Sequence, residues 1–143
     1  MAVSEAQKVI SLVEKALNAR DLKKFRSLHA ENVVLQAPDN PEPVRGVESV
    51  VKWYKGFFDA FPDMKATAGR SVNQGEWLAV EYTITGTHKG PLAGPGGASI
   101  PPTNKAVRVA NLSLYRVKGG KVAEVHEYFD QLSFLTQLGL SNP

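Results

Sequence analysis

Residues 47–62, VESVVKWYKGFFDAFP, carry the clearest helical pattern of the chain. Their apolar positions recur at intervals of three and four residues, at Val47, Val50, Val51, Tyr54, Phe57, Phe58 and Phe61. Charged residues occupy the opposite face, which is typical of an amphipathic helix that covers a core. The pattern stops at Pro62, because the residue before a proline is steered away from the helical conformation. The stretch predicts a helix that packs one apolar face against the rest of the domain.

Two shorter helices and a strand are predicted before this stretch. Ser4 and Gln7 have the spacing of a capping box, and an apolar stripe follows at helical spacing. Asp21 is a plausible N-cap for a second helix. Residues 32–36 are rich in β-branched side chains and predict a short strand, which ends in the turn-forming run 37–43.

After Pro62 the hydrophobic period changes from 3.6 to 2 residues. The alternation predicts strands over residues 64–72, 77–88, 105–117 and 121–129, and then a short closing helix over 132–138. Helices followed by consecutive antiparallel strands are typical of the α+β class rather than of a doubly wound parallel sheet. We therefore expect an α+β fold in which a curved antiparallel sheet packs against amino-terminal helices.

The composition is that of one ordinary globular domain, spanning residues 1–143. There is no cysteine, so disulfides, thiolate nucleophiles and thiolate metal sites are excluded. The net charge is +3, but the basic residues are dispersed, and no basic and aromatic stripe suggests nucleic acid. No apolar stretch has a membrane-spanning length, and the amino terminus lacks the pattern of a signal peptide. A cytoplasmic protein is expected.

Glycine and proline make up half of residues 89–104. A connection of this length inside a small domain is usually either functional or disordered. Leu92 and Ile100 give it apolar tips, so we expect either a lid that contacts substrate through these two side chains or a loose surface loop. No metal or cofactor is expected, because the three histidines lack ligand spacing and no phosphate-binding or nucleophile-elbow motif occurs.

Acid–base chemistry is the remaining candidate, with Asp130, His126 and His88 as its possible catalytic residues. Asp130 follows the apolar and aromatic strand 122–129 and precedes further apolar residues. Burial there would raise the pKa of its carboxyl group and make it a stronger base. The alternative is that Asp130 only caps the closing helix. His126 shares strand parity with Asp130, and His88 lies beside the long loop; both are alternatively structural side chains.

Aromatic side chains on the predicted elements supply candidates for substrate binding. Tyr54 and Phe58 lie on the apolar stripe of the central helix, with core packing as the alternative role. Tyr82 and Tyr128 lie on predicted strands. Together with Leu92 and Ile100, these side chains are expected to surround a small hydrophobic or carbonyl-containing molecule.

Several short motifs occur in the order seen in one known family. They are Asn18-Ala19-Arg20-Asp21, Ala60-Phe61-Pro62-Asp63, Gly86-Thr87-His88-Lys89-Gly90, Pro101-Pro102-Thr103-Asn104-Lys105, Gly120-Lys121-Val122-Ala123-Glu124 and Leu135-Thr136-Gln137-Leu138-Gly139. Through them the chain resembles SnoaL-like polyketide cyclases over nearly its whole length. The resemblance implies the nuclear transport factor 2-like fold, a cone of curved sheet around an apolar pocket. It also implies cofactor-free chemistry, a homodimer or higher oligomer, pocket residues around His88, and an acid–base aspartate that matches Asp130.

The chain departs from the family pattern in two places that bear on its substrate. His126 replaces a tryptophan expected to line the pocket, and residues 94–99 look like an insertion. The resulting hypothesis is proton abstraction next to a carbonyl, followed by aldol-type ring closure within the same molecule. One alternative is a non-catalytic protein that binds a small hydrophobic ligand. Another is an isomerase, or an epoxide hydrolase for which Arg108 and Glu81 are available.

Overall fold

The computed structural model describes residues 2–94 and 97–140. The chain begins with α1 (Glu5–Asn18), α2 (Leu22–Ser27), β1 (His29–Ala37), β2 (Asn40–Arg45) and α3 (Val47–Ala60). It continues with β3 (Lys65–Gln74), β4 (Trp77–Thr87), β5 (Leu92–Ala93), β6 (Ser99–Ile100), β7 (Ala106–Lys118), β8 (Lys121–Phe129) and α4 (Gln131–Gln137). The predicted α+β class is confirmed. Among the described helices, none is long and apolar enough to cross a membrane.

The first two helices begin at the caps that the sequence predicts. The backbone N–H of Gln7 donates to Ser4 Oγ at 3.0 Å, and Gln7 Oε1 accepts from the N–H of Ser4 at 2.9 Å. Asp21 Oδ1 accepts from the N–H of Lys24 at 3.0 Å. These bonds satisfy N–H groups that have no partner inside a helix. The central helix, α3, ends at Ala60, shortly before Pro62.

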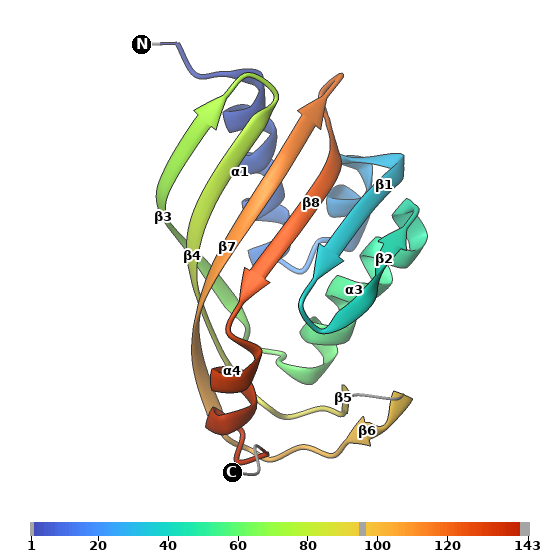
Figure 1. The fold of residues 1–143 in the computed structure, drawn as a ribbon, viewed down its shortest axis with the longest axis vertical. Helices are drawn as coiled ribbons and strands as arrows, with labels where there is room; N and C mark the ends of the chain where they lie inside the picture. The colour runs from blue at the N-terminus through green and yellow to red at the C-terminus, as the bar shows by residue number, and fades with distance from the viewer. Residues whose placement is uncertain (1, 95–96, 141–143) are drawn as a thin grey trace.

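Six strands form one twisted and curved sheet in the order β2-β1-β8-β7-β4-β3 (Figure 1). Neighbouring strands are antiparallel except β1 and β8, which run parallel. Strand β2 was not expected, because Pro41 and Pro43 fall inside it. Prolines are tolerated there because β2 lies at an edge of the sheet, where fewer N–H donors are needed.

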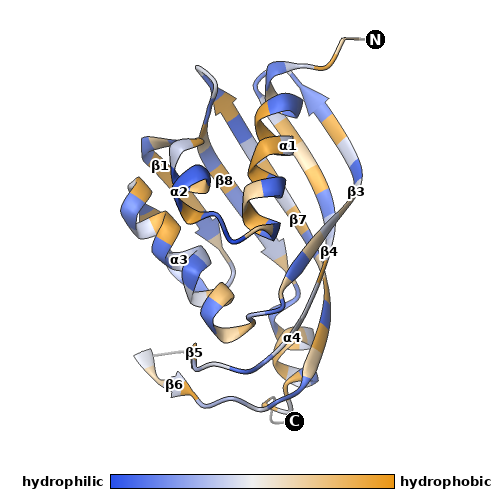
Figure 2. Ribbon diagram, turned by 180° about the vertical axis from the view of Figure 1, so that it is seen from behind, coloured by the Kyte–Doolittle hydropathy of each residue, from blue (hydrophilic) through white to orange (hydrophobic). Residues whose placement is uncertain are grey.

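Helices α1, α2 and α3 cover one face of the sheet and leave the other without helical cover (Figure 2). The inward side chains form the main core, in which Val33, Leu35, Val50 and Val125 are completely buried. The same alternation along each strand sends its other residues to the uncovered outer face. Which face a residue occupies therefore decides whether it can contribute to an enclosed site.

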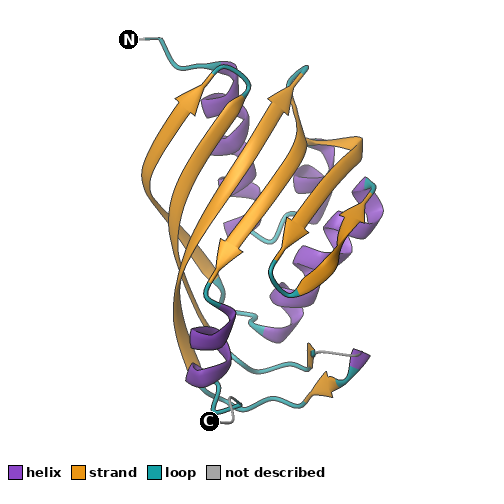
Figure 3. Ribbon diagram, in the orientation of Figure 1, coloured by secondary structure: helices purple, strands orange, loops and turns teal. Residues whose placement is uncertain are grey.

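The end of the sheet beyond α3 is closed by short elements (Figure 3). Strands β5 and β6 pair with each other, and α4 packs against β7. Gly90 allows the chain to pass close to α3, since a Cβ atom there would collide with the carbonyl oxygen of Asp59. Residues 95 and 96, inside the predicted insertion 94–99, lie outside the described residues.

Candidate active site

An apolar cavity lies between α3, α4 and the inner face of the sheet. It contains about 690 Å³ of space not filled by atoms, its open mouth included. Its walls are aromatic and aliphatic for the most part. They are formed by Leu17, Trp53, Tyr54, Phe57, Phe61, Met64, Ala66, Ile84, Thr85, Gly86, Val107, Val109, Asn111, Glu127, Phe129 and Phe134. Among these lining residues Glu127 carries the only carboxylate, so any carboxylate chemistry inside the cavity belongs to this side chain.

Glu127 reaches the cavity because of its position in β8. Val125 and Glu127 are both buried, while Tyr128 between Glu127 and Phe129 is exposed, as alternation along a strand requires. Glu127 is buried, with only 8% of its surface exposed to solvent. Burial in these surroundings raises the pKa of Glu127, since the charged carboxylate loses its hydration. A carboxylate with a raised pKa is a stronger base near neutral pH.

Three polar side chains surround the Glu127 carboxyl group. The Tyr54 hydroxyl donates to Oε2 at 3.2 Å, and the Ser113 hydroxyl donates to Oε1. Ser113 faces Glu127 directly across the β7–β8 ladder, and the Asn111 Nδ2 donates to Ser113 Oγ at 3.0 Å. These bonds favour the charged form and partly offset the effect of burial on the pKa of Glu127. These hydrogen bonds therefore hold the carboxylate in one orientation and stabilise its charged form.

Asp130 lies outside the cavity. It is exposed, it is the N-cap of α4, and its Oδ1 accepts from the N–H of Ser133 at 2.9 Å. It borders an open groove on the outer face together with Leu112 and Tyr128. The expectation that Asp130 is buried against the pocket is wrong, because β8 ends with this side chain directed away from the inner face. The helix cap, left open by the sequence, is the arrangement found.

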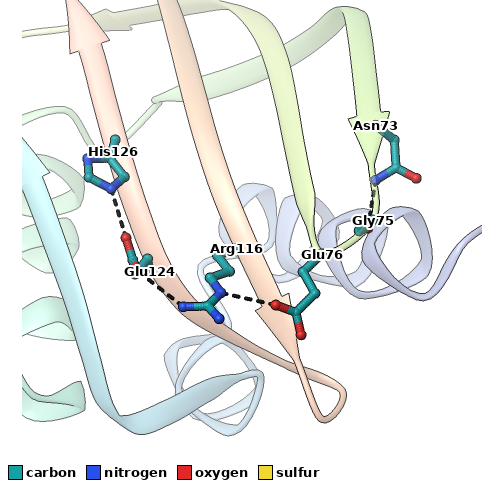
Figure 4. A network of polar contacts seen from close by, with 6 residues as sticks. All are labelled: Asn73, Gly75, Glu76, Arg116, Glu124 and His126. Carbon is teal, nitrogen blue, oxygen red and sulfur yellow. Dashed lines mark hydrogen bonds and ion pairs between the residues drawn. The ribbon is translucent and has the colours of Figure 1, made fainter.

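His126 and Tyr128 also lie on the outer face, so the expectation that they point into the pocket is wrong. His126 Nε2 lies 3.0 Å from Glu124 Oε2, at one end of a chain of surface ion pairs (Figure 4). Arg116 links Glu124, at 3.6 Å, to Glu76, at 3.1 Å. Tyr128 is 55% exposed. The shared parity that the sequence assigns to these residues is correct, but the face they share is the solvent side.

His88 is fully buried but does not line the cavity. Its ring stacks on Phe61, with centroids 5.3 Å apart, and its Nδ1 accepts from the N–H of Thr103 at 3.2 Å. Burial lowers the pKa of His88, which favours the neutral ring. Backbone bonds from His88 to Lys105 and Asn104 join the two ends of the long loop. His88 therefore lies behind the cavity wall, where it packs on Phe61 and connects the two ends of the loop.

The remaining predicted contact residues are divided between several environments. Tyr54 lines the cavity as expected, and sequence analysis missed its partner Glu127. Phe58 is buried, with the Arg20 guanidinium 5.0 Å from its ring centroid, and does not line the cavity.

Leu92 and Ile100 border a small recess that adjoins the cavity through Phe57 and Phe134. Tyr82 lies on the inner face, where its hydroxyl binds other polar groups.

The residues considered for a second carboxylate or a metal lie elsewhere. Glu81 pairs with Arg70 at 2.5 Å on the outer face, and Arg108 is exposed. Within the described residues, no group of three or more histidine, aspartate or glutamate side chains could hold a metal ion. The sequence did contain a signal for Glu127: it is a charged residue at an inward position between Val125 and Phe129 in an apolar strand.

The curved sheet, the helical cover and the apolar cavity define a small α+β domain of the nuclear transport factor 2-like class. Solved structures described as ketosteroid isomerase-like and NTF2-like share this fold. Over residues 7–138 the chain matches the model of the SnoaL-like polyketide cyclases, and it belongs to that family. Membership supports a cyclase- or isomerase-type function in general. A comparison with curated proteins finds no match.

Three solved structures illustrate the likeness. A proposed SnoaL-like polyketide cyclase from Jannaschia sp. CCS1 superposes with a TM-score of 0.86 at 20% identity, covering 100% of this chain and 99% of that one. IdmH, a proposed polyketide cyclase from Streptomyces antibioticus, gives 0.79 at 27% identity, covering 95% and 99%. AclR, a proposed hydroxylase from Streptomyces galilaeus, gives 0.81 at 24% identity, covering 99% and 100%. The different activities proposed for these proteins fit the rule that a fold does not fix a reaction.

Proposed function

We propose that this chain is a cofactor-independent acid–base enzyme in which Glu127 removes a proton next to a carbonyl group. The resulting enolate closes a ring within the same substrate molecule, as in an aldol reaction. The observation that carries this proposal is a single buried carboxylate, held by hydroxyl donors, in an otherwise apolar cavity. The base assigned to Asp130 from the sequence is thereby reassigned to Glu127.

The side chains around Glu127 have complementary parts in this mechanism. The carboxylate takes the proton from carbon, and a positioned base of this kind contributes roughly 10²–10⁴-fold to the rate. Once Glu127 is protonated, the Tyr54 hydroxyl no longer needs to donate to it and can turn toward the developing enolate oxygen. The second N–H of the Asn111 amide is a further donor at the same wall. Tyr54 and Asn111 are therefore the proposed oxyanion donors, and the catalytic part that the sequence suggested for His126 and His88 passes to them.

The cavity supplies the second part of the mechanism. Its aromatic walls bind a small hydrophobic substrate and exclude water from the enolate. Holding reacting groups together in this way can lower a barrier by roughly 7–11 kcal/mol. The likeness to IdmH at 27% identity supports a polyketide-like carbonyl compound as the substrate class.

Two alternatives use the same cavity. An isomerase would need the same base and no ring closure. A binding protein would use the apolar walls and would not need the ionised form of Glu127. Epoxide hydrolysis receives no support, because Glu81 and Arg108 lie away from the cavity.

The proposal can be tested before the natural substrate is known. Cyclohex-3-enone isomerises to cyclohex-2-enone when a base removes a proton from C2 and returns one to C4. We expect the native protein to catalyse this change, Glu127→Gln to lose the activity, and Asp130→Asn to retain it. Calorimetric binding of cyclohex-2-enone to native and Glu127→Gln proteins separates loss of chemistry from loss of binding. Equal turnover by native and Glu127→Gln proteins would remove Glu127 from the mechanism.

A homodimer is part of the same proposal. The outer face of the sheet carries the exposed apolar side chains Val72, Trp77, Leu112 and Tyr128, as the strand registers and their exposure indicate. Apolar side chains gathered on one face commonly mark a protein contact. We propose that a second copy of this chain covers this face. Sedimentation of native and Leu112→Glu proteins tests it, since only the native chain should associate.

A further inference from the structure

Three hydroxyl side chains, none of which lines the cavity, lie between Glu127 and a second carboxylate. Ser113 donates to Glu127. Tyr115 lies two residues further along β7 on the same inward face. Burial raises the pKa of Tyr115, and the neighbouring Ser113 side chain partly offsets this effect. The hydroxyl oxygens of Tyr115 and Tyr82 lie 3.1 Å apart. The Tyr82 hydroxyl donates to Glu14 Oε2 at 2.5 Å. These side chains therefore form a line of three hydroxyl groups between two carboxylates.

The two ends of this line differ in their access to water. Ser113, Tyr115 and Tyr82 are all buried, with exposures of 1%, 6% and 6%. Glu14 lies on α1 and is only half-buried, so its carboxylate exchanges protons with solvent. Glu127 at the other end is buried at the wall of an apolar cavity. A proton on Glu127 would otherwise have to leave through the space that a substrate occupies.

The orientation of the hydroxyl groups follows from their partners. Tyr82 donates to Glu14, so the bond between the two tyrosines is completed by the Tyr115 proton. The oxygen of Tyr115 can then accept from Ser113. Asn111 donates to Ser113 Oγ, which leaves the Ser113 proton free to turn toward either Glu127 or Tyr115. Each hydroxyl can therefore accept a proton from one neighbour while it donates its own to the next.

We propose that Ser113, Tyr115 and Tyr82 relay protons between Glu127 and Glu14. Glu127 would thereby lose or regain its proton without passing it through the cavity. This inference rests on the proposed function, in which Glu127 accepts a proton. In one transfer Glu127 gives its proton to Ser113, which passes its own to Tyr115. Tyr115 passes its proton to Tyr82, and Tyr82 passes its proton to Glu14. One O–H bond breaks and one forms at each hydroxyl, so only the two carboxyl groups change charge.

The first test needs no substrate. The chain has four tyrosines, so labelling with [¹³Cζ]tyrosine gives four resolvable NMR signals. When Glu127 titrates, we expect the signals of Tyr54, Tyr115 and Tyr82 to move with one midpoint and that of exposed Tyr128 to stay. Glu14 accepts from Tyr82, so its own titration also moves the Tyr82 signal, and only the part of the shift that shares the Tyr54 midpoint is due to Glu127. Glu127→Gln should abolish that shared part. The charge of Asp39 also acts on Glu127. The titration is therefore repeated with Asp39→Asn, in which this charge is absent.

Ser113→Ala distinguishes a relay from a field effect. Removal of the hydroxyl should abolish the part of the Tyr82 shift that shares the Tyr54 midpoint, and leave the shift of Tyr54, which donates directly to Glu127. If the part of the Tyr82 shift that shares the Tyr54 midpoint persists at full size in Ser113→Ala, the relay is overturned. Circular dichroism confirms that each variant is folded.

The second test follows the proton during turnover of cyclohex-3-enone in D₂O. With the relay intact, the abstracted proton is exchanged for solvent deuterium before return, so we expect close to one deuterium per product. Tyr82→Phe should lower this ratio several-fold, whereas the matched control Tyr128→Phe should not. Equal ratios in all three proteins would overturn the relay. If the native protein does not isomerise the probe, the proposed function fails on this substrate and the NMR titration alone decides the relay.

Discussion

His126 and Glu127 are neighbours in β8, yet their surroundings differ completely. Glu127 points into an apolar cavity and is held by Tyr54 and Ser113, with its pKa raised by burial. His126 points to the outer face, where it contacts Glu124. A shift of one residue along a strand exchanges the two faces. The pair shows that the part a side chain can play in this domain depends on strand parity more than on residue type.

The largest expected difference between the two faces is catalytic. We expect Glu127→Gln to lower kcat/KM about a thousandfold, because the general base is lost. His126→Ala should change kcat/KM by less than about twofold, because its side chain does not reach the cavity. Steady-state turnover of cyclohex-3-enone by both variants measures the contrast. If His126→Ala had a much lower kcat/KM while Glu127→Gln remained active, the assignment of the two faces would be wrong.

A matched pair of leucines extends the comparison to stability. Leu35 is completely buried, whereas Leu112 on the outer face is 38% exposed. We expect Leu35→Ala to lower the free energy of unfolding by about 3 kcal/mol, through lost burial and the cavity left behind. Leu112→Ala should cost less than about 1 kcal/mol in the monomer. Urea unfolding at low protein concentration measures both, and similar losses would mean that the outer face is also packed.

The ionisation of Glu127 makes stability depend on pH. Burial raises the pKa of Glu127 above its ordinary value of 4.5, so the folded chain binds this proton more tightly than the unfolded chain. The contribution to stability is complete below the ordinary pKa and is lost as the pH rises through the raised one. Glu127→Gln removes this loss, because an amide does not titrate. Each tenfold difference in proton affinity between the folded and unfolded chains corresponds to about 1.4 kcal/mol.

Urea unfolding of native and Glu127→Gln proteins between about pH 4 and pH 8 measures this effect. The variant should gain stability relative to the native protein as the pH rises. The activity of the native protein should fall with decreasing pH through the same raised pKa. A stability difference that does not depend on pH would mean that Glu127 titrates normally.

The smallest effect is expected from the outer ion-pair chain. Arg116 bridges Glu76 and Glu124 with all three side chains at least one-third accessible to solvent. Exposed pairs of this kind contribute about 0–1 kcal/mol. We expect Arg116→Gln to lower the free energy of unfolding by less than about 0.5 kcal/mol and to leave turnover unchanged. Thermal unfolding at low and high salt checks this, since any contribution should shrink with salt.

Sequence patterns predicted the helices and most of the sheet because their signals are local. The caps at Ser4 and Asp21 and the stripe of α3 depend on residues a few positions apart. Strand β2 was missed because Pro41 and Pro43 disfavour a strand unless it lies at an edge, and edge position is a property of the whole sheet. The α+β class followed from the order of the elements alone.

The site was harder to predict because it depends on which face of β8 turns inward. Sequence alternation correctly grouped His126 with Tyr128. However, Asp130 and His126 were predicted to be catalytic because each is a polar residue near apolar ones. The sequence does place Glu127 on the same face as Val125 and Phe129, and the packing of α3 against the sheet then identifies that face as the inner one. Ser113 could be recognised only from the β7–β8 register, since it is separated from Glu127 by a hairpin.

Strand β2 also has a consequence for the behaviour of the chain at high concentration. A free sheet edge is a template on which another chain can add a strand, and such addition leads to open-ended aggregates. Two of the residues in β2, Pro41 and Pro43, have no N–H group to offer to an incoming strand. This margin of the sheet is therefore protected against fibril-like growth, so concentrated solutions of the protein should resist polymerisation from that side.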